Sequence, residues 1–311
     1  MTYIEKVRRR VSEPIRQECW LNIKCRISMQ YSIKLIRLFL YPILFLFILP
    51  TYGQDTLIAR KWWILGVNAM KRDQFDSSAT YFQFASRNYL SIAQRMIRDE
   101  ALPFYQRYLN SSLRMIGAQI LTGKIEKPES LYLPWIDEAR QLLGDSSAVL
   151  VWGLFQFGNS EFDRDKYYDA EKIWLQALSI SNASYGKSSF IGALLNQRLA
   201  NLYSVNNSLH RPDYDKALTA FNRALDIYKQ LEGTRARIGE ANVYNSIGSI
   251  HHMLKSLPEA LRAHLNSLAI LEEIGASASE EISFTCSYIS LIYTEMGDHQ
   301  SAAEYAKRGR F

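Results

Sequence analysis

The sequence is poor in the residues that most often carry chemistry. Of its three cysteines, Cys19 and Cys25 lie near the amino end, so Cys286 has no intramolecular disulfide partner in the rest of the chain. The chain contains no glycine-rich phosphate loop and no Gly-x-Ser-x-Gly nucleophile elbow. Neither a cysteine nor a carboxylate at a recognisable ligand spacing accompanies the histidines. We therefore predict no catalytic residue, no metal site and no cofactor, and no enzymatic activity.

Net charge is absent from most of the chain. The formal charge is +6, from 37 Lys and Arg against 31 Asp and Glu. Residues 1–53 hold nine of the basic and three of the acidic residues, which leaves 28 of each sign in residues 54–311. Because nucleic-acid binding requires an excess of positive charge, usually clustered on one face, we expect no nucleic-acid partner for this larger part.

No apolar run reaches the roughly 20 residues that a membrane span takes. The longest, Leu38–Leu49, has twelve residues, follows Lys34 and Arg37, and precedes small and polar residues at 50–54. This pattern is typical of a secretory signal peptide. We expect cleavage near Gly53-Gln54 and export to the periplasm or the extracellular space. The alternative is a protein anchored in the inner membrane by a single pass, with the 35–49 segment retained.

Residues 1–28 are charged and fit a signal peptide poorly. One interpretation is that translation starts at Met29, which begins an ordinary basic region before the apolar run. The other is that residues 1–28 form a cytoplasmic tail on a membrane anchor. A signal followed directly by glutamine resembles exported proteins of the Bacteroidota.

The second half of the chain contains a repeated helical pattern. In each copy a small residue is followed four residues later by a filler and three residues after that by a second small residue. The four copies are Ala170-Trp174-Ala177, Ala217-Phe221-Ala224, Ala260-His264-Ser267 and Ala302-Ala306-Gly309. Their first alanines are 47, 43 and 42 residues apart. Because this spacing puts small residues on one helical stripe, it lets two antiparallel helices pack closely.

The helices upstream carry a complementary pattern of an aliphatic residue, a small residue and an aromatic ring or histidine three residues on. It occurs at Leu199-Ala200-Tyr203, Ile247-Gly248-His251 and Ile289-Ser290-Tyr293. Together the two patterns resemble the tetratricopeptide repeat (TPR) in a long-helix form of about 42 residues. The resemblance implies an all-α fold, a right-handed α-solenoid of antiparallel helix pairs.

We divide the chain into three parts on this basis. Residues 1–53 form the leader with the signal peptide or anchor, residues 54–145 form irregular helical repeats, and residues 146–311 form TPR-like repeats. Gly297-Asp298 is expected to end one helix and start the next, since glycine favours a helix end and aspartate a helix start.

In the tetratricopeptide family the first helices of successive pairs line a concave groove that binds a peptide or protein. The resemblance therefore implies a non-catalytic interaction scaffold. The outward positions expected to form the groove are Gln197, Asn201, Ser204, Asn242, Asn245, Ser249, His252 and Thr294. Their uncharged amides can donate to and accept from a peptide backbone.

An alternative function follows from the carboxyl end. The chain stops at Phe311, within or just after the last repeat, and shows no polar capping helix behind it. The same architecture resembles the amino-terminal half of two kinds of bacterial protein, a CHAT-type protease and a TPR-linked histidine kinase or transcription regulator. In that case the repeats would be the recruiting or sensing arm of a truncated protein.

Overall fold

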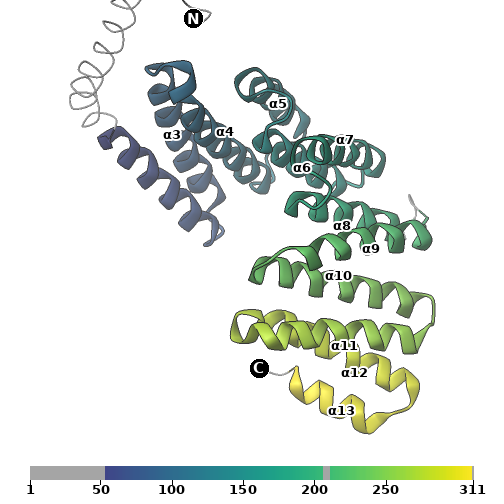
Figure 1. Cartoon of the computed structure of the whole chain (residues 1–311). Helices are drawn as coiled ribbons and strands as arrows, with labels where there is room; N and C mark the ends of the chain where they lie inside the picture. The colour runs from purple at the N-terminus through teal and green to yellow at the C-terminus, as the bar shows by residue number, and fades with distance from the viewer. Residues whose placement is uncertain (1–52, 206–210, 310–311) are drawn as a thin grey trace, which may run out of the picture. The chain divides into compact units, whose positions relative to one another are not determined.

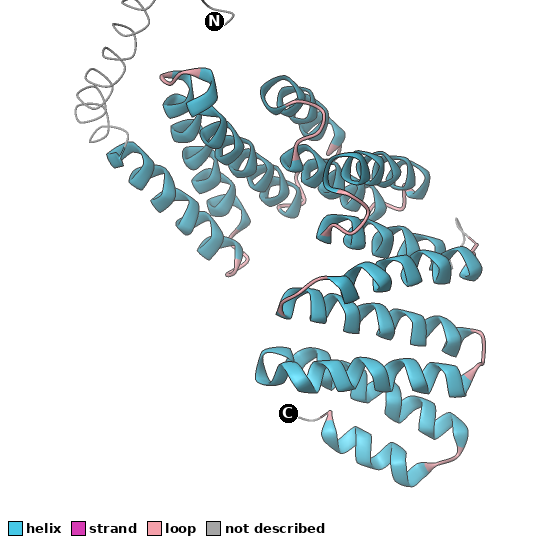
Figure 2. Ribbon diagram, in the orientation of Figure 1, coloured by secondary structure: helices cyan, strands magenta, loops and turns pink. Residues whose placement is uncertain are grey.

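A computed structural model describes residues 53–205 and 211–309, which are predominantly helical (Figure 1). Residues 53–70 are helical, and a 3-10 turn, η1, lies at Gly275–Ala278. The remaining helices are α3 (Phe75–Gln94), α4 (Arg98–Leu121), α5 (Glu129–Leu143), α6 (Ala148–Phe162), α7 (Tyr167–Tyr185), α8 (Phe190–Ser204), α9 (Tyr214–Gln230), α10 (Thr234–Met253), α11 (Leu257–Ile274), α12 (Ser279–Met296) and α13 (His299–Arg308). No strand occurs in these ranges (Figure 2).

The chain divides into two compact units, residues 1–61 and 62–311. The fold described below is that of the second unit. The predicted signal or anchor segment lies outside the described residues, as do residues 206–210 between α8 and α9. Of the helices that are described, none is both long and apolar enough to cross a membrane.

The predicted helix pairs are confirmed as α6 with α7, α8 with α9, α10 with α11, and α12 with α13. In the second helix of the first three pairs, both small residues and the filler are buried. Trp174 and His264 are fully buried and Phe221 is 1% exposed. The small residues Ala170, Ala177, Ala217, Ala224, Ala260 and Ser267 are all fully buried.

Glycines in the first helices make this close packing possible. A Cβ on Gly158 would lie 2.3 Å from Nε1 of Trp174, and a Cβ on Gly248 would lie 2.7 Å from the ring of His264. Both distances are far below van der Waals contact, so each filler ring occupies the space that a side chain would need. The small residue in one helix and the large residue in its partner are therefore two halves of one contact.

Helix ends follow the local sequence chemistry. Gly297 ends α12 in the left-handed conformation, with φ 80°, and the side chain of Asp298 accepts a hydrogen bond from Ser301 N at 3.0 Å to start α13. Ser147, Ser189 and Asp213 cap α6, α8 and α9 in the same way. These caps set where each turn falls, and so set the register between paired helices.

The amino-terminal helices of the second unit are also stacked but pair less regularly. Trp63 packs edge-on against Phe82 at 5.3 Å between ring centroids, and Ser78 Oγ donates to the carbonyl of Gly66 at 2.9 Å. The predicted irregular repeats of residues 54–145 include α4 and α5, with Pro128 at the start of α5. However, α4 packs more extensively against α3 than against α5.

One apolar core runs from Leu109 in α4 to Ile250 in α10 without a break at residue 145. Burial decreases at the last helix, where Ala302 is the buried residue of α13 and Ala306 is half-buried. This agrees with the weak pattern of small residues in the last repeat.

Candidate functional site

The candidate site lies on the face formed by the first helices α6, α8, α10 and α12, which we call the first-helix face. Successive first helices touch one another, α6 with α8 and α8 with α10. Among the described residues, the second helices α7, α9 and α11 do not reach each other to the same extent. The first helices are therefore on the inner side of the stack, where a ligand could contact several repeats at once.

Seven of the eight predicted groove residues keep some exposure to solvent. Thr294 is exposed, and six are half-buried: Gln197, Asn201, Ser204, Asn242, Ser249 and His252. They come from α8, α10 and α12, as the repeat register predicts.

The prediction that Asn245 faces outward is wrong. Its side chain is 6% exposed and lies between α10, α11 and α12. Asn245 Nδ2 donates to Thr285 Oγ1 at 2.8 Å, and Thr285 in turn donates to the carbonyl of Glu281. Asn245 Oδ1 lies 2.9 Å from His264 Nδ1. The repeat pattern predicts an outward position, but here the side chain is buried and forms hydrogen bonds with His264 of α11 and Thr285 of α12.

These contacts assign the protonation of His264. Since the hydroxyl of Thr285 donates to Glu281, it must accept from the Asn245 amide, which leaves Asn245 Oδ1 as an acceptor. His264 Nδ1 therefore carries the proton, and the buried Nε2 has no hydrogen-bond partner among the described atoms. Burial lowers the pKa of His264 to about 4, and the nearby His252 acts in the same direction, so the ring is neutral at pH 7.

Hydrogen bonds within the protein already occupy several of the other predicted residues. The hydroxyls of Ser204, Ser249 and Thr294 each donate to a carbonyl of their own helix, at 2.8, 3.1 and 2.9 Å. His252 Nε2 lies 2.7 Å from Glu295 Oε1, and that carboxylate also faces Lys255. These four side chains have limited capacity left to hold a ligand.

Three amides remain available on α8 and α10. Gln197 Oε1 accepts from the Tyr228 hydroxyl at 3.2 Å, which fixes the side chain and leaves its NH2 group free to donate. The side-chain amides of Asn201 and Asn242 make no hydrogen bond with another described residue. Each offers both donors and an acceptor. This set of donors and acceptors is suited to an extended peptide backbone.

Sequence reasoning missed a neighbouring group of residues, which we call the aromatic-arginine cluster. Its members are Trp152, Phe155, Phe190, Arg198 and Arg235, from α6, α8 and α10. Trp152 lies six residues before Gly158, just as Asn242 lies six residues before Gly248. The signal that could have revealed the cluster was Gly158. It lies twelve residues before Ala170, as Gly248 lies twelve residues before Ala260, and so marks the small-residue position of a first helix. It was missed because Glu161 stands where the other first helices have an aromatic ring or histidine.

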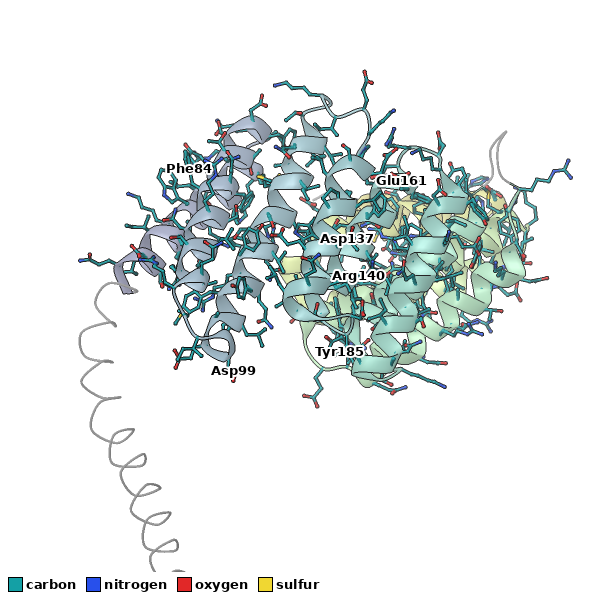
Figure 3. The ribbon with its side chains drawn as sticks, turned by 90° about the horizontal axis from the view of Figure 1, so that it is seen from above. Phe84, Asp99, Asp137, Arg140, Glu161 and Tyr185 are labelled. Atoms are coloured by element: carbon teal, nitrogen blue, oxygen red, sulfur yellow. The ribbon has the colours of Figure 1, made fainter. Side chains whose placement is uncertain are left out.

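Glu161, which is labelled in Figure 3, belongs to a structural ion network. The side chain is 3% exposed, and its carboxylate lies 2.9 Å from Lys166 Nζ. Arg164 and Lys166 also pair with Glu129, at 3.2 and 3.5 Å. The network fastens the α6–α7 turn to the start of α5.

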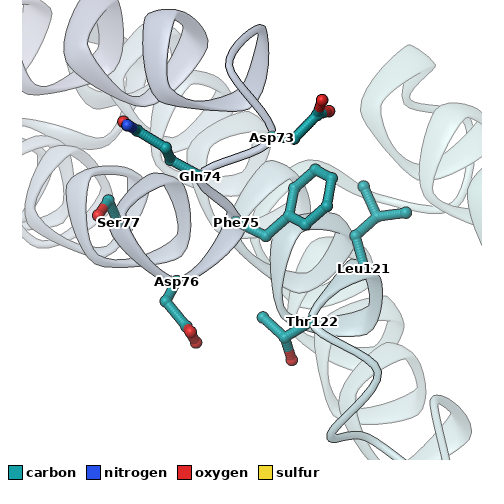
Figure 4. A pocket seen from close by; sticks show the side chains of 7 residues that line it. All are labelled: Asp73, Gln74, Phe75, Asp76, Ser77, Leu121 and Thr122. Atoms are coloured by element: carbon teal, nitrogen blue, oxygen red, sulfur yellow. The ribbon is translucent and has the colours of Figure 1, made fainter.

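Two surface cavities lie elsewhere. One, of about 470 Å³, is lined by residues 73–77, Leu121 and Thr122 (Figure 4). Its Asp76 is paired with Lys124 at 2.9 Å. The other, of about 710 Å³, is formed by the start of α4 and the end of α5, where Arg140 is paired with Asp137 and Asp145. Neither brings together a nucleophile and a base, and the described residues include no group of three potential metal ligands.

The fold and the first-helix face define an α-solenoid of paired helices, a class of protein that presents an extended inner surface. Within this class, residues 209–273 match the Tetratricopeptide repeat family. No curated protein matches the chain.

Solved structures agree with this assignment of the fold. BtubC (BKLC) from P. vanneervenii is similar over 76% of this chain and 89% of its own, with a TM-score of 0.64 and 18% identity. The apo form of RapI is similar over 81% of each chain, with a TM-score of 0.52 and 12% identity. The Rap conjugation gene regulator of plasmid pLS20, in complex with the Phr peptide, is similar over 82% of this chain and 61% of its own, with a TM-score of 0.52 and 16% identity. At such identities the similarity concerns the fold alone.

Proposed function

We propose that the protein is a non-enzymatic scaffold that binds an extended peptide segment of a partner protein on its first-helix face. The observation that carries this proposal is the row of available amides, Gln197, Asn201 and Asn242, on two adjacent first helices. A peptide backbone presents one donor and one acceptor per residue, which side-chain amides can satisfy regardless of the peptide sequence. The pLS20 regulator has a similar fold, and its structure is of a complex with a peptide. This similarity supports a peptide as the ligand.

The test is a selection of short random peptides displayed on phage against the full chain, followed by affinity measurement on the selected peptides. Asn201→Ala with Asn242→Ala should weaken binding by about tenfold or more, since each lost hydrogen bond contributes roughly 1 kcal/mol. The matched control is Asn222→Ala with Asn266→Ala, which removes two exposed amides from the second helices α9 and α11.

We expect the control to bind as the wild type does, and both variants to keep the helical circular dichroism of the wild type. Equal loss of affinity in both pairs, or no loss in the first pair, would contradict the proposed face. The same face would serve equally as the recruiting arm of a longer polypeptide. Coding sequence for an output domain beyond Phe311 would distinguish that role from a stand-alone scaffold.

A further inference from the structure

The aromatic-arginine cluster is a continuous arrangement of rings and guanidinium groups across three first helices. Trp152 and Phe155 of α6 pack edge to face at 5.3 Å between centroids. The Arg235 guanidinium lies 4.4 Å from the Phe190 ring centroid and 6.0 Å from that of Trp152, and Arg198 lies 5.8 Å from Phe155. The rings bury one side of each cation, which orients the planar group.

Neither arginine forms an ion pair with a carboxylate of the described residues, although both are exposed. Two other arginines that bridge helices are neutralised: Arg237 pairs with Glu240 and Glu273, and Arg308 pairs with Glu272. A stacked guanidinium keeps its N–H donors in the plane of the group, available to a ligand. The guanidinium groups of Arg198 and Arg235 therefore present positive charge and N–H donors that no carboxylate of the described residues neutralises.

The cluster adjoins the available amides. Phe190 packs edge-on against Tyr228 at 5.8 Å, and the Tyr228 hydroxyl holds Gln197. Gln197 and Arg198 are also consecutive in α8. Burial raises the pKa of Tyr228 to about 12, while the positive charges of Arg235 and Arg198 act in the opposite direction. A ligand held by Gln197 would therefore extend to the two arginines.

We propose that Arg198 and Arg235 bind a carboxylate of the partner peptide, so that the protein selects peptides with an acidic residue or a free carboxyl end at this point. This inference rests on the proposed function, to which it adds the chemistry of the ligand. A carboxylate matches the paired donors of a guanidinium in a bidentate geometry. The rings beneath the arginines would also contact an apolar residue beside the acidic one.

A nucleic acid is a poorer match for the same arginines. The charges of residues 54–311 sum to zero, whereas phosphate-backbone binding uses a stripe of several cations. In the test, preference for an oligonucleotide over acidic peptides would overturn the proposal.

The experiment uses the peptides selected on the wild-type full chain. They should be enriched in Asp and Glu, or should require a free rather than amidated carboxyl end. Arg198→Gln with Arg235→Gln should lower affinity for an acidic peptide by about tenfold or more, as loss of charge-assisted hydrogen bonds implies. The same variant should not change affinity for the peptide in which that carboxylate is replaced by an amide.

Arg223→Gln with Arg262→Gln is the matched control, because it removes two exposed arginines from the second helices α9 and α11. Wild-type binding should weaken with added salt more than binding by the Arg198/Arg235 variant does. Selected peptides without acidic preference, or equal losses in both arginine pairs, would overturn the inference while leaving the proposed function intact. Failure of the proposed function is distinct: no peptide is selected, or the Asn201/Asn242 variant binds normally.

Discussion

At the scale of single residues, the polar trio of Asn245, His264 and Thr285 is the feature that departs most from an ordinary helical-repeat core. His264 is fully buried at a position where the equivalent residues are Trp174 and Phe221. Its ring stacks on Tyr288 at 5.1 Å, with an interplanar angle of 14°. The imidazole packs like an aromatic ring but needs a hydrogen-bond acceptor, which Asn245 supplies.

We predict that the folded state loses stability as the pH falls from about 7 to about 4. The pKa of His264 is about 4 in the folded protein and 6.5 ordinarily, so the unfolded chain binds more protons between these values. Its neutral form stabilises the fold fully above pH 6.5, and this stabilisation is lost as the pH approaches 4. At pH 5 the loss amounts to about 2 kcal/mol. Urea unfolding at a series of pH values measures it.

His264→Phe is the control, because phenylalanine fills the position without titrating. The variant should be flatter in stability between pH 7 and 5, even if it is less stable throughout through loss of the bond to Asn245. The carboxylate of Glu295 has a lowered pKa because it accepts a hydrogen bond from His252. Protonation of Glu295 therefore weakens the fold only at a pH below the range in which His264 acts. An unchanged slope in His264→Phe would show that another group causes the pH dependence.

At the scale of elements, the junction of α5 and α6 depends on one glycine. A Cβ on Gly153 would lie 1.9 Å from Cζ3 of Trp135. The indole has little freedom to move, because its Nε1 donates to both the carbonyl of Leu109 at 3.1 Å and Ser112 Oγ at 3.0 Å. Three helices, α4, α5 and α6, therefore meet at this ring.

Gly153→Ala should destabilise the protein by about 1–3 kcal/mol, or more if Trp135 loses its hydrogen bonds. Gly117→Ala is the matched control, since Gly117 lies in α4 with no atom within 4 Å of an added Cβ. That substitution should stabilise by about 0.5–1 kcal/mol through helix propensity. Thermal and urea unfolding midpoints measure both. Similar effects of the two substitutions would contradict the role given to Trp135.

The sequence predicted the helix pairs because their packing is local to each repeat. Alanines such as Ala217 and Ala260 mark a contact within one pair, so the pattern alone reveals it. It did not predict the burial of Asn245, which depends on Thr285 in the next repeat, 40 residues away. Nor did it predict the aromatic-arginine cluster, because the contacts of Arg235 with Phe190 and Trp152 join residues of three repeats. A repeat pattern predicts what recurs, whereas these contacts occur once.

At the scale of the whole molecule, the amino end and the repeats differ in charge and composition. We propose that residues 1–53 direct export and are removed near Gly53-Gln54. Cleavage there would leave all the described residues from Gln54 onward in the mature chain.

Mass spectrometry of protein recovered from a bacterial host should give a mature amino terminus at or near Gln54. Leu44→Arg, which interrupts the apolar run, should leave the precursor uncleaved, because a signal peptide needs its apolar core. A tryptic peptide between Arg8 and Arg16 in the mature protein would contradict removal of the leader.

The pairing of each filler with its own small residue bears on whether the repeats are interchangeable. Trp174 fits over Gly158 and His264 over Gly248, and His264 also needs Asn245 from its own repeat and Tyr288 from the next. Duplicating or exchanging a single repeat would keep each filler over its own glycine, but it would separate His264 from Tyr288 and Asn245 from Thr285 of the next repeat. The stack is built from similar repeats, yet each repeat contacts particular residues of the next one. Lengthening it would therefore require inserting repeats whose contacting residues match those of their neighbours.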